Sequence, residues 1–403
     1  MNAQEIIALE QQYVVQTYKR PEFVLAKGSG LYVYDTEGKS YLDFLSGIAV
    51  NALGHRHPAV VQAIEEQTAK LLHVCNLYHT APQALLARDL AQSTPAADRV
   101  YFCNSGTEAV EACIKFARKW GQAHPAAGGQ ARRDFVAFEH SFHGRTMGAL
   151  ALTYKERYRA PFVPVMPGAH FAPYNDPAAA RQLVEQVQPC AVIVEAVQGE
   201  GGVYPASPEF LQELRTVCDE NDALLICDEI QCGLGRTGAL WGFEPGGILP
   251  DLIAVAKPLG GGLPIGAALV AEKVAALLEP GDHGSTFAAN PLICAVARAV
   301  LGVINEPEFL AGIGEKGDYM HKALNDLAAG HECITEVRGR GLIWGVDTTL
   351  QTKDILAAGY ENGILLGSSG EHTVRLLPPY TVNKSEIDQA VGKLAHIFDV
   401  LEN

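Results

Sequence analysis

The sequence predicts an α/β protein in which a large, mostly parallel sheet is joined by a smaller α+β part. Between about residues 58 and 300, short apolar segments alternate with amphipathic helical segments. Short apolar strands separated by helices imply crossover connections and a parallel sheet that is covered on both faces. The expected strands are RVYFC (99–103), DFVAFE (134–139), CAVIVEA (190–196), ALLICDE (223–229) and DLIAVA (251–256), and the expected helices include 58–72, 108–120 and 208–221.

Mixed patterns at the two ends of the chain predict the smaller part. Residues 5–18 have the pattern of a short helix that stops before Pro21. Residues 23–47 alternate apolar and polar side chains around turn-forming glycines, which is typical of an antiparallel hairpin or meander. In the last third of the chain, helices are expected over 290–304, 308–328 and 384–401.

The chain has 403 residues, which is long enough for two domains with a large buried core. We expect the N-terminal segment (1–57) and the C-terminal segment (301–403) to form one small domain beside a large domain (58–300). The sequence shows no internal repeat.

The composition predicts a soluble cytoplasmic protein. The formal net charge is −15 and basic residues form no run, so no nucleic-acid partner is expected. The nine cysteines are odd in number and include no C-x-x-C, which argues against a disulfide framework or a metal site and favours a reducing compartment. The N-terminus lacks the apolar core of a signal peptide, and no apolar stretch approaches the length of a membrane span, so no membrane association is expected.

Candidate functional residues follow the predicted strands, because ligands of such sheets bind beyond the carboxyl ends of the strands. After RVYFC come Ser105, Gly106 and Thr107, and Ser105 with Glu108 has the spacing of a helix N-terminal capping box. A helix that begins there offers free N–H groups, a favourable dipole and two hydroxyl groups to a phosphate. The same spacing is also typical of an ordinary capped helix.

Three further strand ends carry polar or aromatic residues. DFVAFE is followed by Phe142, His143 and Arg145, which are candidates for ring stacking and anion binding or, alternatively, ordinary core, loop and surface residues. Flexible glycines flank Glu200 after AVIVEA. Asp228 ends a strongly apolar strand, where an aspartate either caps a turn or pairs with a buried cation.

Lys257 is the only charged residue in the segment AVAKPLGGGLPIGAAL (254–269). A buried ammonium group is unfavourable unless its pKa shifts or it is bonded, although a lysine at a strand end can also extend its amine to water. Taken together, a phosphate cradle, an aromatic ring with an arginine, a buried carboxylate and a buried lysine match pyridoxal 5′-phosphate, which binds as a lysine Schiff base with an acidic partner for its pyridine nitrogen.

Several longer motifs carry a family resemblance. They are FLSGIAVNALGHRHP (44–58), NSGTEA (104–109), FHGRT (142–146), QGEGG (198–202), DEIQCGLGRTG (228–238), AKPLGGGLPIGA (256–267) and HGSTFAANPLICAVA (283–297). With these motifs the chain resembles the class III (ω-amino acid) aminotransferases almost from end to end, in particular the acetylornithine aminotransferases. The resemblance implies the fold of fold-type I pyridoxal-phosphate enzymes, with a seven-stranded sheet.

The resemblance also implies roles for the cofactor-binding residues. Lys257 would hold the cofactor and then move the proton between the substrate and the cofactor, and Asp228 would keep the pyridine nitrogen protonated. Phe142 and Ile230 would enclose the ring, and Gln231 would approach its phenolic oxygen. The phosphate would be bound by Ser105, Gly106 and Thr107, and by Thr286 of the neighbouring subunit, so the active unit would be a homodimer with its active sites at the interface.

The substrates implied by the resemblance are small amino acids and 2-oxo acids. Arg145 would hold the carboxylate that is distant from the reacting amine, and Ser285 would lie beside the substrate. Arg375 of VRLLPP would bind the α-carboxylate of glutamate, and Glu200 would neutralise Arg375 when the other substrate is bound. An arginine fork suits a carboxylate because both make two parallel hydrogen bonds.

The expected reaction is amino transfer from N2-acetyl-L-ornithine to 2-oxoglutarate, which gives N-acetylglutamate semialdehyde and L-glutamate. Succinylornithine, ornithine, 4-aminobutyrate and a broader range of ω-amines remain alternative donors, because these enzymes would share Lys257, Asp228 and the cradle. A pyridoxal-dependent mutase or decarboxylase is less compatible with Glu200 and Arg375, a pair suited to alternating substrates. A non-enzymatic binding module would have no reason to place a lysine and an aspartate at matching strand ends.

Overall fold

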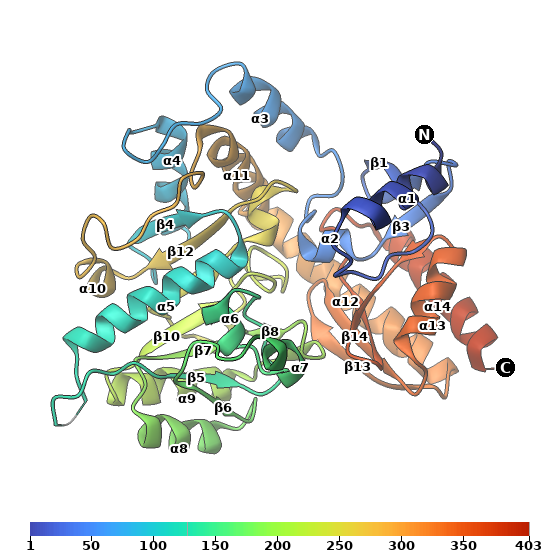
Figure 1. Cartoon of the computed structure of the whole chain (residues 1–403). Coiled ribbons are helices and arrows are strands. Elements are labelled where there is room, and N and C mark those ends of the chain that lie inside the picture. The colour runs from blue at the N-terminus through green and yellow to red at the C-terminus, as the bar shows by residue number, and fades with distance from the viewer. Residues whose placement is uncertain (127, 403) are drawn as a thin grey trace.

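The central feature of the fold is a seven-stranded sheet with the order β4-β12-β11-β10-β7-β5-β6. This computed structural model describes residues 1–126 and 128–402 (Figure 1). The strands are β4 (Arg99–Cys103), β5 (Phe135–Phe138), β6 (Ala169–Ala172), β7 (Ala191–Val194), β10 (Leu224–Asp228), β11 (Leu252–Val255) and β12 (Gly266–Val270).

The prediction of a mostly parallel sheet is confirmed. The β10 strand pairs in parallel with β7 and β11, and β5 pairs in parallel with β6 and β7. Only β12 runs against its two neighbours, β4 and β11. The five strands expected from apolar segments are all present, and β6 and β12 complete the sheet.

Helices cover both faces of this sheet, as strands that are apolar on both sides require. Leu224 and Ile226 of β10 pack in one cluster with α5 (Gly106–Ala123), whereas Leu225 and Cys227 point to the opposite cluster. In Figure 1, α5 crosses one face of the sheet. The helices that contribute to the opposite cluster include α3 (Pro58–Thr68), α4 (Ala81–Ala91), α8 (Pro177–Val187), α9 (Pro208–Glu220) and α11 (Pro291–Ile304).

The two ends of the chain meet in the smaller part, where blue and red elements lie together in Figure 1. The predicted meander is confirmed, since β1 (Leu25–Ser29), β2 (Tyr32–Asp35) and β3 (Ser40–Asp43) are antiparallel neighbours. From the C-terminal segment, β15 (Ile364–Leu365) joins β3 in parallel. A second antiparallel sheet contains β13 (Ile334–Arg340), β14 (Ile343–Thr348), β17 (Thr373–Leu376) and β16 (Gly367–Ser369).

The helices predicted near the chain ends are present, with shifted limits. The N-terminal helix α1 (Ala3–Tyr13) begins at a capping box of Asn2 and Glu5 and ends where Val14 becomes extended, which is earlier than the expected residue 18. The C-terminal helices are α12 (Pro307–Gly330), α13 (Thr352–Glu361) and α14 (Lys384–Glu402). The division at residues 57 and 300 into domains stays a prediction, and its last residue, 403, lies outside the described residues.

The remaining elements are short and lie in the connections. They are α2 (Ser46–Ala49), α6 (Met147–Ala151), α7 (Glu156–Arg159), α10 (Glu272–Ala275), β8 (Val197–Gln198) and β9 (Tyr204–Pro205), with single 3-10 turns at 160–162, 244–246 and 257–260.

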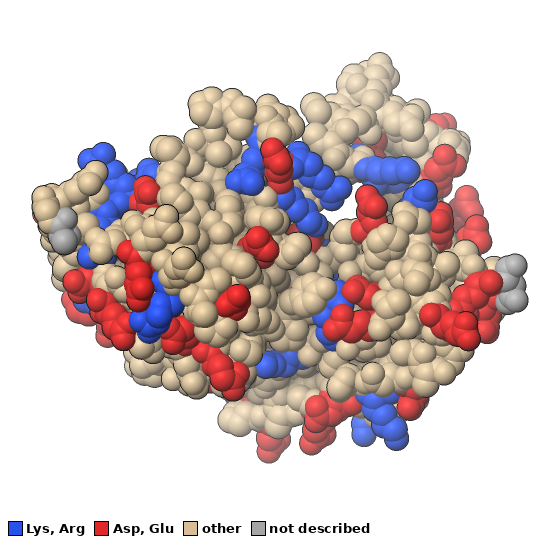
Figure 2. Space-filling view, turned by 90° about the horizontal axis from the view of Figure 1, so that it is seen from below, with Lys and Arg blue, Asp and Glu red and all other residues tan. Residues whose placement is uncertain are grey.

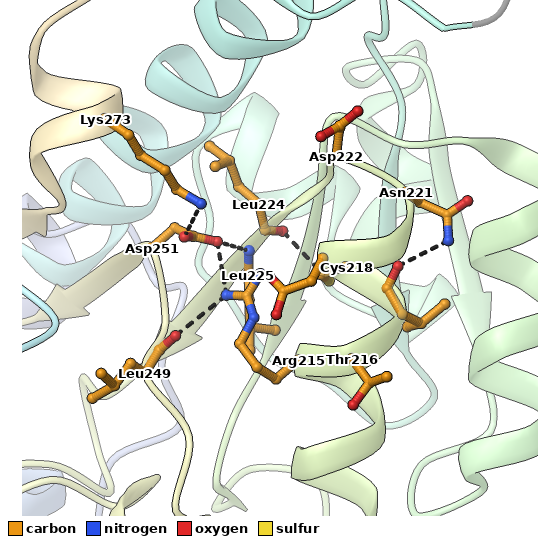
Figure 3. A network of polar contacts seen from close by, with 12 residues as sticks. Arg215, Thr216, Cys218, Asn221, Asp222, Leu224, Leu225, Leu249, Asp251 and Lys273 are labelled. Atoms are coloured by element: carbon orange, nitrogen blue, oxygen red, sulfur yellow. Dashed lines mark hydrogen bonds and ion pairs between the residues drawn. The ribbon is translucent and has the colours of Figure 1, made fainter.

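A polar network around the buried Asp251 fixes the beginnings of the two central strands (Figure 3). The carboxylate of Asp251, which precedes β11, accepts the N–H of Leu225 in β10 at 2.7 Å. Arg215 of α9 and Lys273 of α10 approach the same carboxylate at 2.9 and 2.6 Å. Because Asp251 is buried, these two cations supply the charge compensation that it needs. The network therefore joins α9 and α10 to β10 and β11.

The surface carries charges of both signs. On the face drawn in Figure 2, Lys and Arg residues lie in small groups between Asp and Glu residues. Along the described ranges, no helix combines the length and the apolar character that a bilayer crossing needs.

Candidate active site

A cavity of about 450 Å³ opens where the carboxyl ends of the parallel strands meet. β4, β5, β7, β10 and β11 all end at this edge, so residues that are far apart in the sequence come together. The site residues predicted from the sequence that line this cavity are Ser105, Gly106, Thr107, Phe142, Arg145, Glu200, Asp228, Ile230, Gln231 and Lys257.

Lys257 follows β11 and has a strained backbone. Its φ angle is +36°, in a region that residues other than glycine rarely adopt and that carries a free-energy cost of about 1–3 kcal/mol. Gly261 and Gly262, also with positive φ, continue the turn beside it. Burial lowers the pKa of Lys257 to about 8, helped by the nearby Arg375. A lysine with this pKa is partly neutral near pH 8, which suits an amine that must bind a carbonyl group and exchange protons.

Asp228 is held in place from two sides. One carboxylate oxygen, Oδ2, lies 2.8 Å from Nδ1 of His143, and the other, Oδ1, accepts the N–H of Ile230 at 3.1 Å. Both Asp228 and His143 are buried. His143 lies in the loop after β5, as one of the two alternatives expected, and there its ring fixes the carboxylate that faces the cavity. Only the tertiary structure shows this pairing, since 85 positions separate the two residues.

The predicted helix start is present beside the cavity, but only half of the predicted capping box forms. The hydroxyl of Ser105 accepts the N–H of Glu108 at 3.4 Å, and α5 begins at Gly106. The carboxylate of Glu108, however, accepts the N–H of Asn104 at 2.6 Å instead of that of Ser105. The N–H of Glu108 is thus used by the cap, whereas the N–H groups of Gly106 and Thr107 have no acceptor among the described residues and can bind an anion.

Gly106 lies in tight contact with the residue expected to cover the cofactor ring. A Cβ atom at Gly106 would lie 2.9 Å from two side-chain carbons of Ile230. A larger residue at position 106 would therefore displace Ile230 from the cavity, so this glycine is needed for the packing, and its contact with a phosphate stays a prediction.

Arg375 forms an ion pair at 3.1 Å with Glu200, which lines the cavity, although Arg375 itself is not among the lining residues. Arg375 is buried and also donates to the carbonyl of Gly199 at 2.9 Å, with Gln231 Oε1 at 3.4 Å. Burial lowers the pKa of Arg375, and Glu200 counteracts this effect. The hydroxyl of Ser369 donates to the carbonyl of Glu200 at 2.6 Å. The backbone of the glycine-rich loop is thus fixed, whereas the carboxylate of Glu200 faces the cavity.

Arg145 is an exposed residue at the mouth of the cavity. Its guanidinium group lies 3.6 Å from the ring centroid of Tyr158 and 5.5 Å from that of Phe142. Aromatic contacts orient the guanidinium plane and leave its N–H groups available to a carboxylate.

Ser285 and Thr286 lie outside the residues that line the cavity of this chain. Ser285 Oγ accepts a hydrogen bond from Asn104 at 2.9 Å, so it contacts a cavity residue indirectly. Thr286 is exposed. Their expected contacts with substrate and with the neighbouring subunit's phosphate stay predictions.

Glu195 is a cavity residue that the sequence analysis did not single out. It is buried, and its carboxylate accepts the N–H of Phe142 at 3.0 Å. Burial raises the pKa of Glu195 well above its usual value, and the nearby Asp228 adds to the effect. The signal in the sequence was a carboxylate directly after the apolar segment AVIV, just as Asp228 ends LLICD.

The donor set fits pyridoxal 5′-phosphate. A free helix N-terminus can bind the phosphate, Phe142 and Ile230 can enclose a ring, Asp228 can hold the ring nitrogen, and Lys257 can bind the aldehyde. No group of His, Cys, Asp and Glu side chains within residues 1–126 and 128–402 is arranged to hold a metal ion.

Comparisons with known proteins agree with a site for pyridoxal 5′-phosphate. The family model described as "Aminotransferase class-III" matches residues 13–398. An acetylornithine aminotransferase from Alnus glutinosa is 46% identical over 99% of this chain and 89% of its own length, and one from Caldanaerobacter subterraneus is 44% identical over 96% of this chain and 97% of its own. A succinylornithine transaminase from Yersinia pseudotuberculosis is 44% identical over 95% and 94%, respectively.

Solved structures with the same fold are also aminotransferases. The ornithine aminotransferase from Toxoplasma gondii superimposes with a TM-score of 0.94 at 31% identity, covering 100% of this chain and 96% of that one. The N-acetylornithine aminotransferase from Stenotrophomonas maltophilia gives a TM-score of 0.84 at 33% identity, covering 98% and 99%. With the family model, these matches show that the chain belongs to the class-III aminotransferases, which are pyridoxal-phosphate enzymes of fold type I.

Proposed function

We propose that this protein transfers the ω-amino group of N2-acetyl-L-ornithine to 2-oxoglutarate and releases N-acetylglutamate semialdehyde and L-glutamate. The names of the relatives support this donor, because acetylornithine aminotransferases match over nearly the whole chain. The similar succinylornithine transaminase keeps N2-succinylornithine as the second candidate donor.

The observation that carries the proposal is the ion pair between the buried Arg375 and Glu200, a partly exposed residue of the cavity lining. A transaminase must accept two unlike substrates in turn. Glutamate brings an α-carboxylate next to its reacting amine, whereas the ω-amine of acetylornithine is attached to an apolar chain. Glu200 can neutralise Arg375 when the apolar chain is bound, and it can release the guanidinium group when an α-carboxylate is bound.

Arg145 completes the recognition of both substrates. Because it lies at the cavity mouth with its guanidinium group held over Tyr158, it can bind the carboxylate that lies far from the reacting amine. Both acetylornithine and glutamate have such a carboxylate. Arg145 therefore serves both half-reactions, and Arg375 serves only the half-reaction with glutamate or 2-oxoglutarate.

Lys257 and Asp228 carry the chemistry. Pyridoxal phosphate, when bound, supplies the carbonyl group that takes up the amine and a ring that accepts electron density. Lys257 Nζ takes the proton from the amine-bearing carbon of the substrate. A pKa of about 8 suits the lysine to give that proton up again, to the cofactor. Asp228, held by His143, stabilises a proton on the ring nitrogen.

A homodimer and a cytoplasmic location are part of the proposal. Helix α1 buries none of its own residues, and apolar side chains such as Tyr13, Tyr18 and Phe287 are exposed, which supports a second copy covering them. Thr286, next to Phe287, would then be close to the partner's cofactor. All nine cysteines are free, which is compatible with a reducing compartment.

A panel of amine donors tests the proposal. The purified enzyme is incubated with 2-oxoglutarate and N2-acetylornithine, N2-succinylornithine, ornithine or 4-aminobutyrate, and glutamate formation is measured. We expect kcat/KM to be highest with N2-acetylornithine. A higher value with another donor would replace acetylornithine in the proposal, and the absence of glutamate with every donor would overturn it.

A further inference from the structure

Glu111 forms a polar centre behind the phosphate cradle. It lies on α5, and its Oε1 atom accepts hydrogen bonds from the hydroxyl of Thr146 at 2.5 Å and from the N–H groups of Gly148 and Ala149 at 2.9 and 3.1 Å. These three donor residues lie at the start of α6, whose N-cap, Thr146, directly follows Arg145. One carboxylate thus holds the beginning of α6 against the helix that carries the cradle.

Two glycines permit this close approach. A Cβ atom at Gly148 would lie 2.4 Å from the carboxylate of Glu111, and a Cβ atom at Gly144 would lie 2.3 Å from the hydroxyl of Thr107. Gly144 also has a φ of +137°, which favours glycine. The segment from 144 to 148 therefore lies directly on the first turns of α5.

The hydroxyl groups of Thr107 and Thr146 continue the chain of contacts. Their oxygen atoms are 2.9 Å apart. A hydroxyl group has a single proton, and that of Thr146 is donated to the Glu111 carboxylate, which accepts only. Thr107 must then be the donor to Thr146. The hydrogen bonds run in one direction, from Thr107 through Thr146 to Glu111.

The lone pairs of Thr107 Oγ1 face the backbone of the same segment. The N–H groups of Arg145 and Thr146 point to this oxygen at 3.3 and 3.4 Å. With its proton committed to Thr146, the Thr107 hydroxyl serves to connect the cradle to the Arg145 segment. Its main-chain N–H, in the first turn of α5, remains the group that Thr107 offers to a phosphate.

We propose that Glu111 and Thr146 are positioning residues that fix the phosphate cradle and Arg145 relative to each other through the hydroxyl of Thr107. The proposal rests on the roles given to Thr107 and Arg145 under the proposed function. Its consequence is that removing the hydrogen bonds from Thr107 through Thr146 to Glu111 weakens the binding of the cofactor and of both substrates together. The chemistry at Lys257 should change little, because neither residue lines the cavity.

The test compares Thr146→Val, which removes the hydroxyl but keeps the shape, with Thr146→Ser, which keeps the hydroxyl. Glu111→Gln retains an acceptor oxygen and removes the charge. Thr216→Val is the matched control, because its hydroxyl donates within the exposed surface of α9, away from the cavity. For each variant, thermal unfolding, the affinity of the cofactor-free protein for pyridoxal 5′-phosphate, and kcat and KM for both substrates are measured.

We expect Thr146→Val to weaken cofactor affinity and to raise both KM values, each by about three- to tenfold, with kcat at saturation close to that of the wild type. Glu111→Gln should act in the same direction, and Thr146→Ser and Thr216→Val should resemble the wild type. If Thr146→Val lowers only the unfolding temperature, or if Thr146→Ser is as impaired as Thr146→Val, the proposal is overturned. The cofactor titration does not depend on the donor, so a wrong choice of acetylornithine would leave this test valid.

Discussion

Nδ1 of His143 lies 2.8 Å from Oδ2 of Asp228, and both side chains are buried at the carboxyl end of the sheet. This contact joins the loop after β5 to the last residue of β10. The imidazole ring fixes one oxygen of the carboxylate, and the N–H of Ile230 fixes the other. The orientation of the carboxylate toward the cavity is therefore determined before any ligand binds.

Asp228→Asn should lower kcat by about a hundredfold or more and affect folding only modestly. The amide can still accept the N–H of Ile230, but it has no charge with which to hold a proton on a ring nitrogen. Steady-state rates and thermal unfolding measure the two effects separately. If Asp228 were only a turn cap, asparagine would replace it well and the rate would stay near normal.

Lys257→Ala should abolish turnover while the protein still binds the cofactor through the phosphate contacts at α5. Cofactor content after gel filtration and glutamate formation give the two readouts. Lys155→Ala is a suitable control, because Lys155 is a neighbouring lysine that bonds the carbonyl of Glu200 at 3.4 Å and lies outside the cavity lining. Full activity of Lys257→Ala would refute the mechanism.

The stability of the cofactor-free protein should rise with pH between about 8 and 10.5 because of Lys257. In this range the folded protein has released the Lys257 proton, whereas the unfolded chain still binds it, so deprotonation favours the folded state. Below about pH 8 the lysine is protonated in both states, and its unfavourable burial is fully present. The measurement is the difference in unfolding free energy between the wild type and Lys257→Met across this range. A difference that does not change with pH would contradict the lowered pKa.

The three charged substrate residues should separate the two half-reactions. Glu200→Ala should lower the rate of the half-reaction with the ornithine-type donor by about tenfold, because Arg375 then faces the apolar chain without a partner. The rate of the half-reaction with glutamate should stay the same or rise. Arg375→Ala should do the reverse, and Arg145→Ala should impair both. Stopped-flow measurement of single half-reactions is the test. Equal losses for both substrates in Glu200→Ala would exclude the exchange of partners at Arg375.

Asp251→Asn should destabilise the protein by about 3 kcal/mol, because Arg215 and Lys273 both lose the buried carboxylate that they approach, and Arg215 is left with the exposed Asp219 as its carboxylate partner. The control is Glu272→Gln, which removes an exposed ion pair with Arg99 and should change stability little. Chemical unfolding of both variants measures the difference. Equal effects of the two substitutions would show that burial of Asp251 does not determine the contribution of its network (Figure 3).

The sequence by itself determined the alternation of strands and helices, the N-cap of α5 at Ser105, and the placement of Asp228 and Lys257 at the ends of apolar segments. These features depend on local pattern: side-chain periodicity, caps, and glycine or proline at turns. The family motifs are also contiguous in the sequence, so the class of enzyme could be predicted from them.

Only the tertiary structure decided which distant groups meet. The pairing of His143 with Asp228, the contact of Glu195 with Phe142, and the antiparallel direction of β12 have no local signature. The same holds for the partner of Glu108, which is the N–H of Asn104 and not that of Ser105. A buried polar group needs a hydrogen-bond partner, and the partner is whichever group the packing places next to it. The identity of that group depends on the tertiary arrangement of the strands and loops, not on residues nearby in the sequence.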